Sequence, residues 1–142
     1  MYPIDTSYLK KCNLALTRAY SYLNRYSEND VEYEIYRSAV IKEFEIILEQ
    51  SGKLLKKILR AYLHSNRAVD RLVFKDIFRQ AGLHGLLSID EVQRWLKYRD
   101  NRNSTSHNYG AFLANETLIL IEEFIIDVEH LIEVIDDNST TR

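Results

Sequence analysis

A long helical pattern runs over residues 31–63. Apolar side chains recur there at three- and four-residue steps, which places them on one face of a helix. The chain has 142 residues but only four Gly and a single Pro, at position 3. An all-β chain needs many more turn residues than this. The sequence therefore predicts an all-α fold built from a few long helices.

The same spacing predicts the other helices. Helices are expected over residues 6–26, 31–63, 70–82, 88–101 and 111–136. Asp5 or Thr6 is expected to cap the first helix, Ser88 or Asp90 the fourth, and Gly82 to end the third. Short breaks between helices are typical of an antiparallel, up-and-down bundle, here with four main helices and a short one. Residues 1–142 are expected to form one domain with a frayed polar tail from about residue 137.

The net charge of −2 is unevenly distributed. Residues 51–110 contain 12 Lys and Arg against 5 Asp and Glu, whereas residues 111–142 contain 1 against 8. Oppositely charged helices that lie side by side would explain this pattern. A basic face for a polyanion would explain it as well, although charged faces are more often simply solvated.

Several classes of protein are not expected. The chain has no stretch of 18 apolar residues and no signal-peptide pattern, so neither a membrane span nor export is predicted. Cys12 is the only cysteine and cannot form an internal disulfide, which suits a reducing cytoplasm. One Cys and four scattered His give no zinc pattern, so no metal site is predicted.

The segment RNSTSHNYG, residues 102–110, interrupts the helical pattern. On a continuous helix, Arg102 and His107 would point about 140° apart and could not share a site. The polar residues between them are poor helix-interior residues and good caps, so one helix is predicted to end near Asn101 and the next to start near Ser106. Such a turn would bring Arg102 towards His107.

The residue types indicate what this turn could do. Arg presents a planar fork of donors that fits a phosphate, and His exchanges protons near neutral pH. RNA supplies its own nucleophile, the 2′-hydroxyl group, so an Arg and a His suffice for a metal-free ribonuclease. By chemistry alone, however, an Arg and a His beside a helix break are more often part of an ordinary capped surface loop.

A resemblance to a known family favours a ribonuclease site over an ordinary capped loop. R-N-S-T-S-H-N-Y resembles the R-x-x-x-x-H-x-Y signature of HEPN-domain toxins, which are paired with a minimal nucleotidyltransferase antitoxin and were also called nucleotidyltransferase substrate-binding proteins. The segments 44–56 and 78–83, followed by Trp95, also resemble this family, so that the likeness covers roughly residues 35–135. Gly52 departs from the pattern, because a large aromatic residue is expected there.

The resemblance implies a helical-bundle homodimer with one composite ribonuclease site in the cleft between protomers. Arg102 would bind the scissile phosphate of a tRNA or mRNA, His107 would act as general acid or base, and Asn103 would support them by hydrogen bonding. The product would be a 2′,3′-cyclic phosphate, formed without a cofactor. The partner nucleotidyltransferase would use ATP and magnesium to transfer AMP to Tyr109, which would silence the toxin. DNA is not an expected substrate.

Two alternatives remain open. The chain could be a non-enzymatic substrate-binding or adaptor subunit of a nucleotidyltransferase, or a plain helical interaction protein. Arg94, Lys97 and Arg99 could contact RNA, or equally could pair with the acidic last helix. The basic face formed by Lys53, Lys56, Lys57 and Arg60 could be a second RNA contact or merely solvated, and the remaining histidines, His64, His84 and His130, are expected at the surface.

Overall fold

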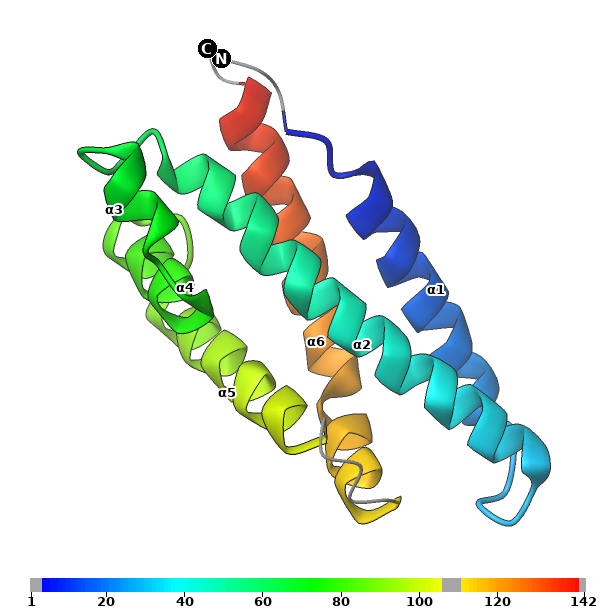
Figure 1. Ribbon diagram of the computed structural model, residues 1–142. Coiled ribbons are helices and arrows are strands. Elements are labelled where there is room, and N and C mark those ends of the chain that lie inside the picture. The colour runs from blue at the N-terminus through cyan, green and yellow to red at the C-terminus, as the bar shows by residue number, and fades with distance from the viewer. Residues whose placement is uncertain (1–3, 106–110, 141–142) are drawn as a thin grey trace.

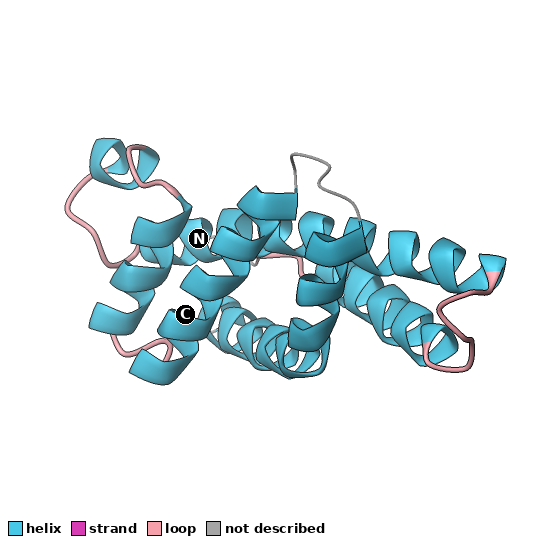
Figure 2. Cartoon of the chain, turned by 90° about the horizontal axis from the view of Figure 1, so that it is seen from below, coloured by secondary structure: helices cyan, strands magenta, loops and turns pink. Residues whose placement is uncertain are grey.

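The computed structural model describes residues 4–105 and 111–140, and all regular structure within them is helical (Figures 1 and 2). The four long helices are α1 (Ser7–Leu23), α2 (Val31–Leu59), α5 (Ile89–Thr105) and α6 (Ala111–Thr140). Two short helices, α3 (Asn66–Asp70) and α4 (Phe74–Leu83), connect α2 to α5. The all-α prediction is confirmed, with two short helices in place of one.

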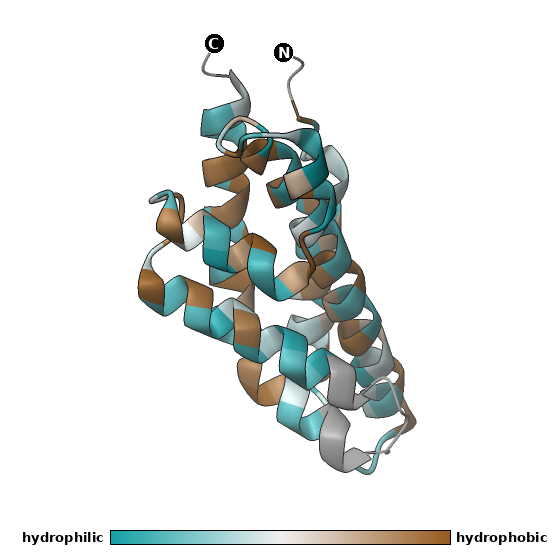
Figure 3. Ribbon diagram, turned by 60° about the vertical axis from the view of Figure 1, so that its left-hand side comes forward, coloured by the Kyte–Doolittle hydropathy of each residue, from teal (hydrophilic) through white to brown (hydrophobic). Residues whose placement is uncertain are grey.

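The long helices alternate in direction, as an up-and-down bundle requires (Figure 1). α2 lies at the centre and packs against α1, α4 and α6, while α5 packs against α4 and α6. The end of α6 and the start of α1 lie at one end of the bundle, and the last turns of α5 lie near the opposite end (Figure 1). Apolar and polar residues alternate along the long helices, which is the pattern of helices with one buried face (Figure 3).

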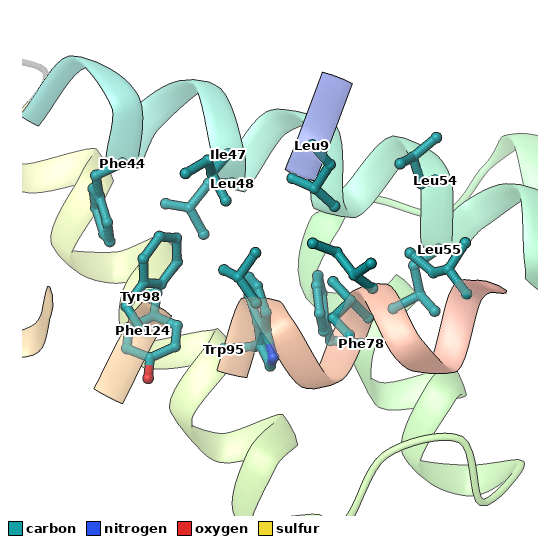
Figure 4. Close-up of a cluster of buried hydrophobic side chains, with 14 of the residues drawn as sticks. Leu9, Phe44, Ile47, Leu48, Leu54, Leu55, Phe78, Trp95, Tyr98 and Phe124 are labelled. Carbon is teal, nitrogen blue, oxygen red and sulfur yellow. The ribbon is translucent and has the colours of Figure 1, made fainter. Parts of the chain in front are cut away.

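An aromatic cluster joins α5 to its neighbours (Figure 4). The Trp95 ring stacks on Phe78 of α4 at 4.7 Å between centroids, and Tyr98 meets Phe124 of α6 edge-on at 4.9 Å. Phe44 of α2 lies 4.7 Å from the same Phe124 ring. All five side chains are fully buried, and such ring pairs contribute about 0.5–1.5 kcal/mol each beyond their area. The cluster therefore fixes α5, which carries the motif, against three other helices.

Several helix boundaries differ from the predicted ones because tertiary contacts outweigh local propensity. α1 ends at Leu23 and α2 at Leu59, three and four residues earlier than predicted, and residues 66–70 form α3 with Ser65 as its N-cap. α6 continues to Thr140, past residue 137, where the polar tail was predicted to begin. Asn138 donates to the Val134 carbonyl at 2.8 Å and accepts from the Tyr62 hydroxyl at 3.1 Å.

The caps of α1 and α4 also differ in part from expectation. Thr6 occupies the N-cap position of α1, but its hydroxyl donates to Asp136, and Asp5 is the side chain that accepts from the Ser7 amide. Gly82 does not end α4, which continues to Leu83. The left-handed residue is Gly85, with φ of 76°. Its amide donates to the Gly82 carbonyl and the next amide donates to the Ala81 carbonyl, which is a Schellman motif.

Gly52 and Gly82 serve close approaches of helices. A Cβ atom on Gly82 would lie 2.9 Å from Cγ2 of Val92, so Gly82 lets α4 approach α5. A Cβ atom on Gly52 would lie 3.0 Å from the Phe74 ring. An aromatic ring from α4 thus occupies the space beside Gly52, the position where the family resemblance led us to expect an aromatic residue.

Candidate active site

Arg102 lies in the last turn of α5, half-buried, where α5 meets the first half of α6. The preceding residue, Asn101, accepts a hydrogen bond from the hydroxyl of Thr117, which is fully buried on α6. This bond ties the end of α5 to α6 beside Arg102. The predicted phosphate-binding arginine therefore directly follows the residue that ties α5 to α6.

The predicted helix break near Asn101 is wrong, because α5 continues through Thr105. Asn, Ser and Thr each cost only a few tenths of a kcal/mol in a helix relative to good helix formers. The part-buried bond between Asn101 and Thr117 and the packing of the buried Tyr98 outweigh that cost. Arg102 is therefore held on a regular helix.

The remaining motif residues are described in part or not at all. The backbone of Asn103 is helical in α5, but its side chain lies outside what the structure describes. His107 and Tyr109 lie outside the described residues altogether. Their predicted roles stay predictions. In the sequence, both residues lie between the end of α5 at Thr105 and the start of α6 at Ala111.

Asp127 of α6 has a buried carboxylate, and the sequence analysis did not single out this residue. Its carboxylate accepts two hydrogen bonds from Arg94, both at 2.9 Å, and one from the Tyr98 hydroxyl. Burial first, and then the bond to Asp127, raise the pKa of Tyr98 well above its usual value, while the same carboxylate raises the pKa of Arg94. The available signal was an acidic residue among buried apolar ones in the last helix, between Phe124 and Val128.

Three basic residues of α5 were considered as RNA contacts: Arg94, Lys97 and Arg99. Their surroundings differ. Arg94 pairs with the acidic last helix, which favours the second interpretation of this residue. Arg99 faces α2, with its guanidinium 3.8 Å from Glu49 and 5.1 Å from the centre of the Phe74 ring. Lys97 is exposed and lines a hollow of about 380 Å³ between α5 and α6, together with Ile119.

A second set of contacts joins the start of α5 to α6. Ser88 and Glu91 form a capping box, in which each side chain accepts from the other residue's amide, at 3.1 and 3.0 Å. Glu91 also contacts Nδ1 of His130. Burial alone would raise the pKa of Glu91, but the hydrogen bonds from the Ser88 amide and from His130 outweigh it and lower that pKa. Ser88, not Asp90, is therefore the cap of α5. α5 also lies beside the acidic α6, and Arg94 pairs with Asp127 there, as one charge interpretation expected.

His64 and His84 were expected at the surface, and both are exposed. The His84 ring lies 5.0 Å from Tyr62. Within residues 4–105 and 111–140, no three side chains of the metal-binding kinds converge. In the same ranges, none of the helices combines the length and hydropathy needed to cross a bilayer.

The family model described as "Nucleotidyltransferase substrate binding protein like" matches residues 9–137. The chain belongs to this family. The match runs from the first turn of α1 to the last turns of α6 and includes the whole motif segment, and it confirms the resemblance that the motif indicated.

Individual relatives agree with this assignment. A Haemophilus influenzae protein named "Probable ribonuclease HepT" is 34% identical over 96 residues, which cover 68% of this chain and 64% of that protein. The chain thus matches just under two thirds of that relative's length. The solved structure of HI0074 from Haemophilus influenzae, described as a substrate binding domain of a nucleotidyltransferase, is similar with a TM-score of 0.78 and 25% identity, over 92% of this chain and 98% of that one. A crystal structure from Thermus thermophilus shares the fold, with a TM-score of 0.71 and 23% identity over 89% and 98% of the two chains.

Proposed function

We propose that this chain is a metal-independent endoribonuclease, the toxin of a toxin–antitoxin pair. The observation that carries the proposal is the R-x-x-x-x-H-x-Y motif in a chain of this family, with its arginine in the last turn of α5. The relative named as a probable ribonuclease supports the same activity. The proposed substrate is tRNA or mRNA.

The proposed reaction uses the nucleophile that RNA carries. The 2′-oxygen forms a bond to phosphorus while its proton passes to a base, and the bond from phosphorus to the 5′-oxygen breaks as that oxygen gains a proton. The products are a 2′,3′-cyclic phosphate and a 5′-hydroxyl end. His107 exchanges the protons, and the Arg102 guanidinium binds the phosphate and stabilises the negative charge on its oxygens in the transition state. Asn103 supports both by hydrogen bonding.

A homodimer completes the proposed site, since two copies of His107 then supply both the acid and the base. The exposed surface of α6 supports such a dimer. Ile119 and Ile126 are 81% and 62% exposed and lie two helical turns apart on one face of α6. Ile119 also lines the hollow beside Lys97 and Asn101, and Asn101 directly precedes Arg102 in the sequence. A second copy packed on this face would cover these apolar side chains and bring two arginines together.

The proposed regulation is the transfer of AMP to Tyr109 by a nucleotidyltransferase partner that binds ATP and magnesium. The phenol oxygen forms a bond to the α-phosphorus of ATP, pyrophosphate leaves, and the phenol proton is released. The added phosphodiester brings a negative charge and a nucleoside to a position two residues from His107. It would compete with RNA for Arg102, so the modified protein is inactive.

The deciding experiment is a cleavage assay in EDTA with total tRNA and an mRNA, comparing the purified wild type with His107→Ala. We expect cleavage by the wild type and none by the variant, although both fold alike by circular dichroism. The intact mass of each sample is measured first, because AMP on Tyr109 adds about 329 Da and would silence the wild type. Equal cleavage by the two proteins, or no cleavage by unmodified wild type, would refute the proposal.

A second candidate is a non-enzymatic substrate-binding subunit of a nucleotidyltransferase. The similarity to HI0074, which is described in those terms, favours it. This candidate predicts a stable complex with the nucleotidyltransferase and no ribonuclease activity. Labelled ATP distinguishes a substrate from an adaptor, because label on the wild type that is lost in Tyr109→Phe identifies a modification at that residue.

A further inference from the structure

A groove lies between α2, α4 and α5, on the opposite side of α5 from the hollow beside Lys97. It has a volume of about 320 Å³, which is within the range of sites for small ligands or single nucleotides. Its lining residues come from the second half of α2, the start of α4 and the end of α5, and they include Glu49, Lys53, Lys56, Val73, Phe74 and Arg99.

The groove combines an excess of positive charge with apolar walls. Lys53, Lys56 and Arg99 face one carboxylate, Glu49, which pairs with Arg99 at 3.8 Å and is 52% exposed. Such a long, exposed ion pair is worth little, and it leaves both lysines uncompensated. Lys56 donates one hydrogen bond to the Asp70 carbonyl, whereas Lys53 has no polar partner among the described residues. Positive charge in a concave, partly apolar site attracts anions more strongly than a flat solvated face does.

The structure divides the basic face predicted from the sequence. Arg60 is engaged with Asp70 and Asn66, and Lys57 is exposed and does not line the groove. Only Lys53 and Lys56 of that face point to a binding site. Lys57 therefore provides a matched control on the same helix.

The position of the groove indicates which anion it binds. Arg99 lines the groove, and Arg102 follows it on α5 by three residues, about 4.5 Å along the helix axis. Residues three apart are neighbours on a helix surface, so the groove opens within one turn of the proposed phosphate-binding arginine. An RNA strand held at Arg102 would place an adjoining nucleotide within reach of the groove.

We infer that this groove is an RNA subsite, which holds a phosphate of the same strand on Lys53, Lys56 and Arg99, with the attached ribose or base against Phe74 and Val73. This inference rests on the proposed function, because it assumes RNA as the ligand. Val73 is 64% exposed at the rim and suits such a contact. The groove would thus bind substrate next to the cleaved bond and lower KM without touching the reacting atoms.

The test measures RNA binding separately from cleavage. Full-length His107→Ala protein, confirmed unmodified by mass, is titrated into a fluorescein-labelled single-stranded RNA of about a dozen nucleotides at several salt concentrations. Adding Lys53→Ala should weaken RNA binding about three- to tenfold. The slope of log affinity against log salt concentration should become less negative by about 0.7, the value for one phosphate contact to a single strand. Lys57→Ala should leave affinity and slope unchanged, and Lys53→Arg should retain both.

Equal binding by Lys53→Ala and Lys57→Ala would overturn the subsite. The same result together with cleavage by the wild type would leave the proposed ribonuclease standing. Conversely, RNA binding that depends on Lys53 in a wild type that never cleaves RNA would support the groove and remove the ribonuclease. Loss of nucleotidyltransferase binding in Lys53→Ala with RNA binding intact would also overturn the subsite, because the groove would then be a protein contact.

Discussion

Replacing Asp127 with Asn should reveal how strongly the buried ion pair holds α5 on α6. The Asp127 side chain is 3% exposed, and three donors converge on its two oxygens, two from Arg94 and one from Tyr98. Asn has nearly the same shape but only one acceptor oxygen, and its amide group would face a donor. The substitution therefore removes the charge and leaves at least one buried donor without an acceptor.

The magnitude follows from the burial of the two partners. Removing one member of a fully buried ion pair costs about 3–5 kcal/mol. The Arg94 side chain is 31% exposed and regains some hydration, so we expect a loss of about 2–3 kcal/mol in the free energy of unfolding. A domain of this kind has about 5–15 kcal/mol in total. At about 3 °C per kcal/mol for a chain of this length, Tm should fall by roughly 6–9 °C.

Urea unfolding followed by circular dichroism measures this loss, and Glu123→Gln is the control. Glu123 lies on the same helix and faces the same arginine, but at 3.9 Å and with a side chain that is 63% exposed. Its substitution should cost less than about 0.5 kcal/mol. If Asp127→Asn cost no more than Glu123→Gln, the buried pair would contribute nothing beyond an ordinary surface contact, and our account of how α5 is fixed would be wrong.

Two further substitutions test the packing of α5. Glu91→Gln should cost about 1–2 kcal/mol at pH 7, because it weakens the capping box and the contact with His130. Folding lowers the pKa of Glu91, so its contribution to stability is present above its unfolded pKa of about 4.5 and is lost as pH falls through the folded value. The free energies of unfolding of wild type and variant, measured by urea titration, should therefore converge at low pH. Gly82→Ala should destabilise the wild type by about 1–3 kcal/mol, because its Cβ would lie 2.9 Å from Val92, as thermal unfolding would show. In a Val92→Ala background Gly82→Ala should be neutral or stabilising, since Ala favours the helix over Gly by about 1 kcal/mol. Equal destabilisation in both backgrounds would exclude the steric explanation.

Local signals in the sequence predicted most of the helices. The three- and four-residue steps between apolar residues over 31–63 identified the buried face of α2, on which Val40, Phe44 and Leu48 are fully buried. Ser88 with Glu91 three residues later is a capping box that the sequence alone could have supplied in full. Helix ends were less predictable, because α5 and α6 extend beyond their predicted ends through contacts such as the one between Asn101 and Thr117, which lie 16 residues apart.

Periodicity and motif spacing are properties of neighbouring residues, so the helical class, the family and the motif residues could be identified without a structure. The surroundings of those residues became visible only once the helices were placed against one another. Arg94 pairs with Asp127 of another helix. Of the two lysines Lys53 and Lys57, the first lines the groove beside Arg99 and the second does not. These contacts join residues from different helices, and their formation depends on how the helices pack, which no local pattern in the sequence records.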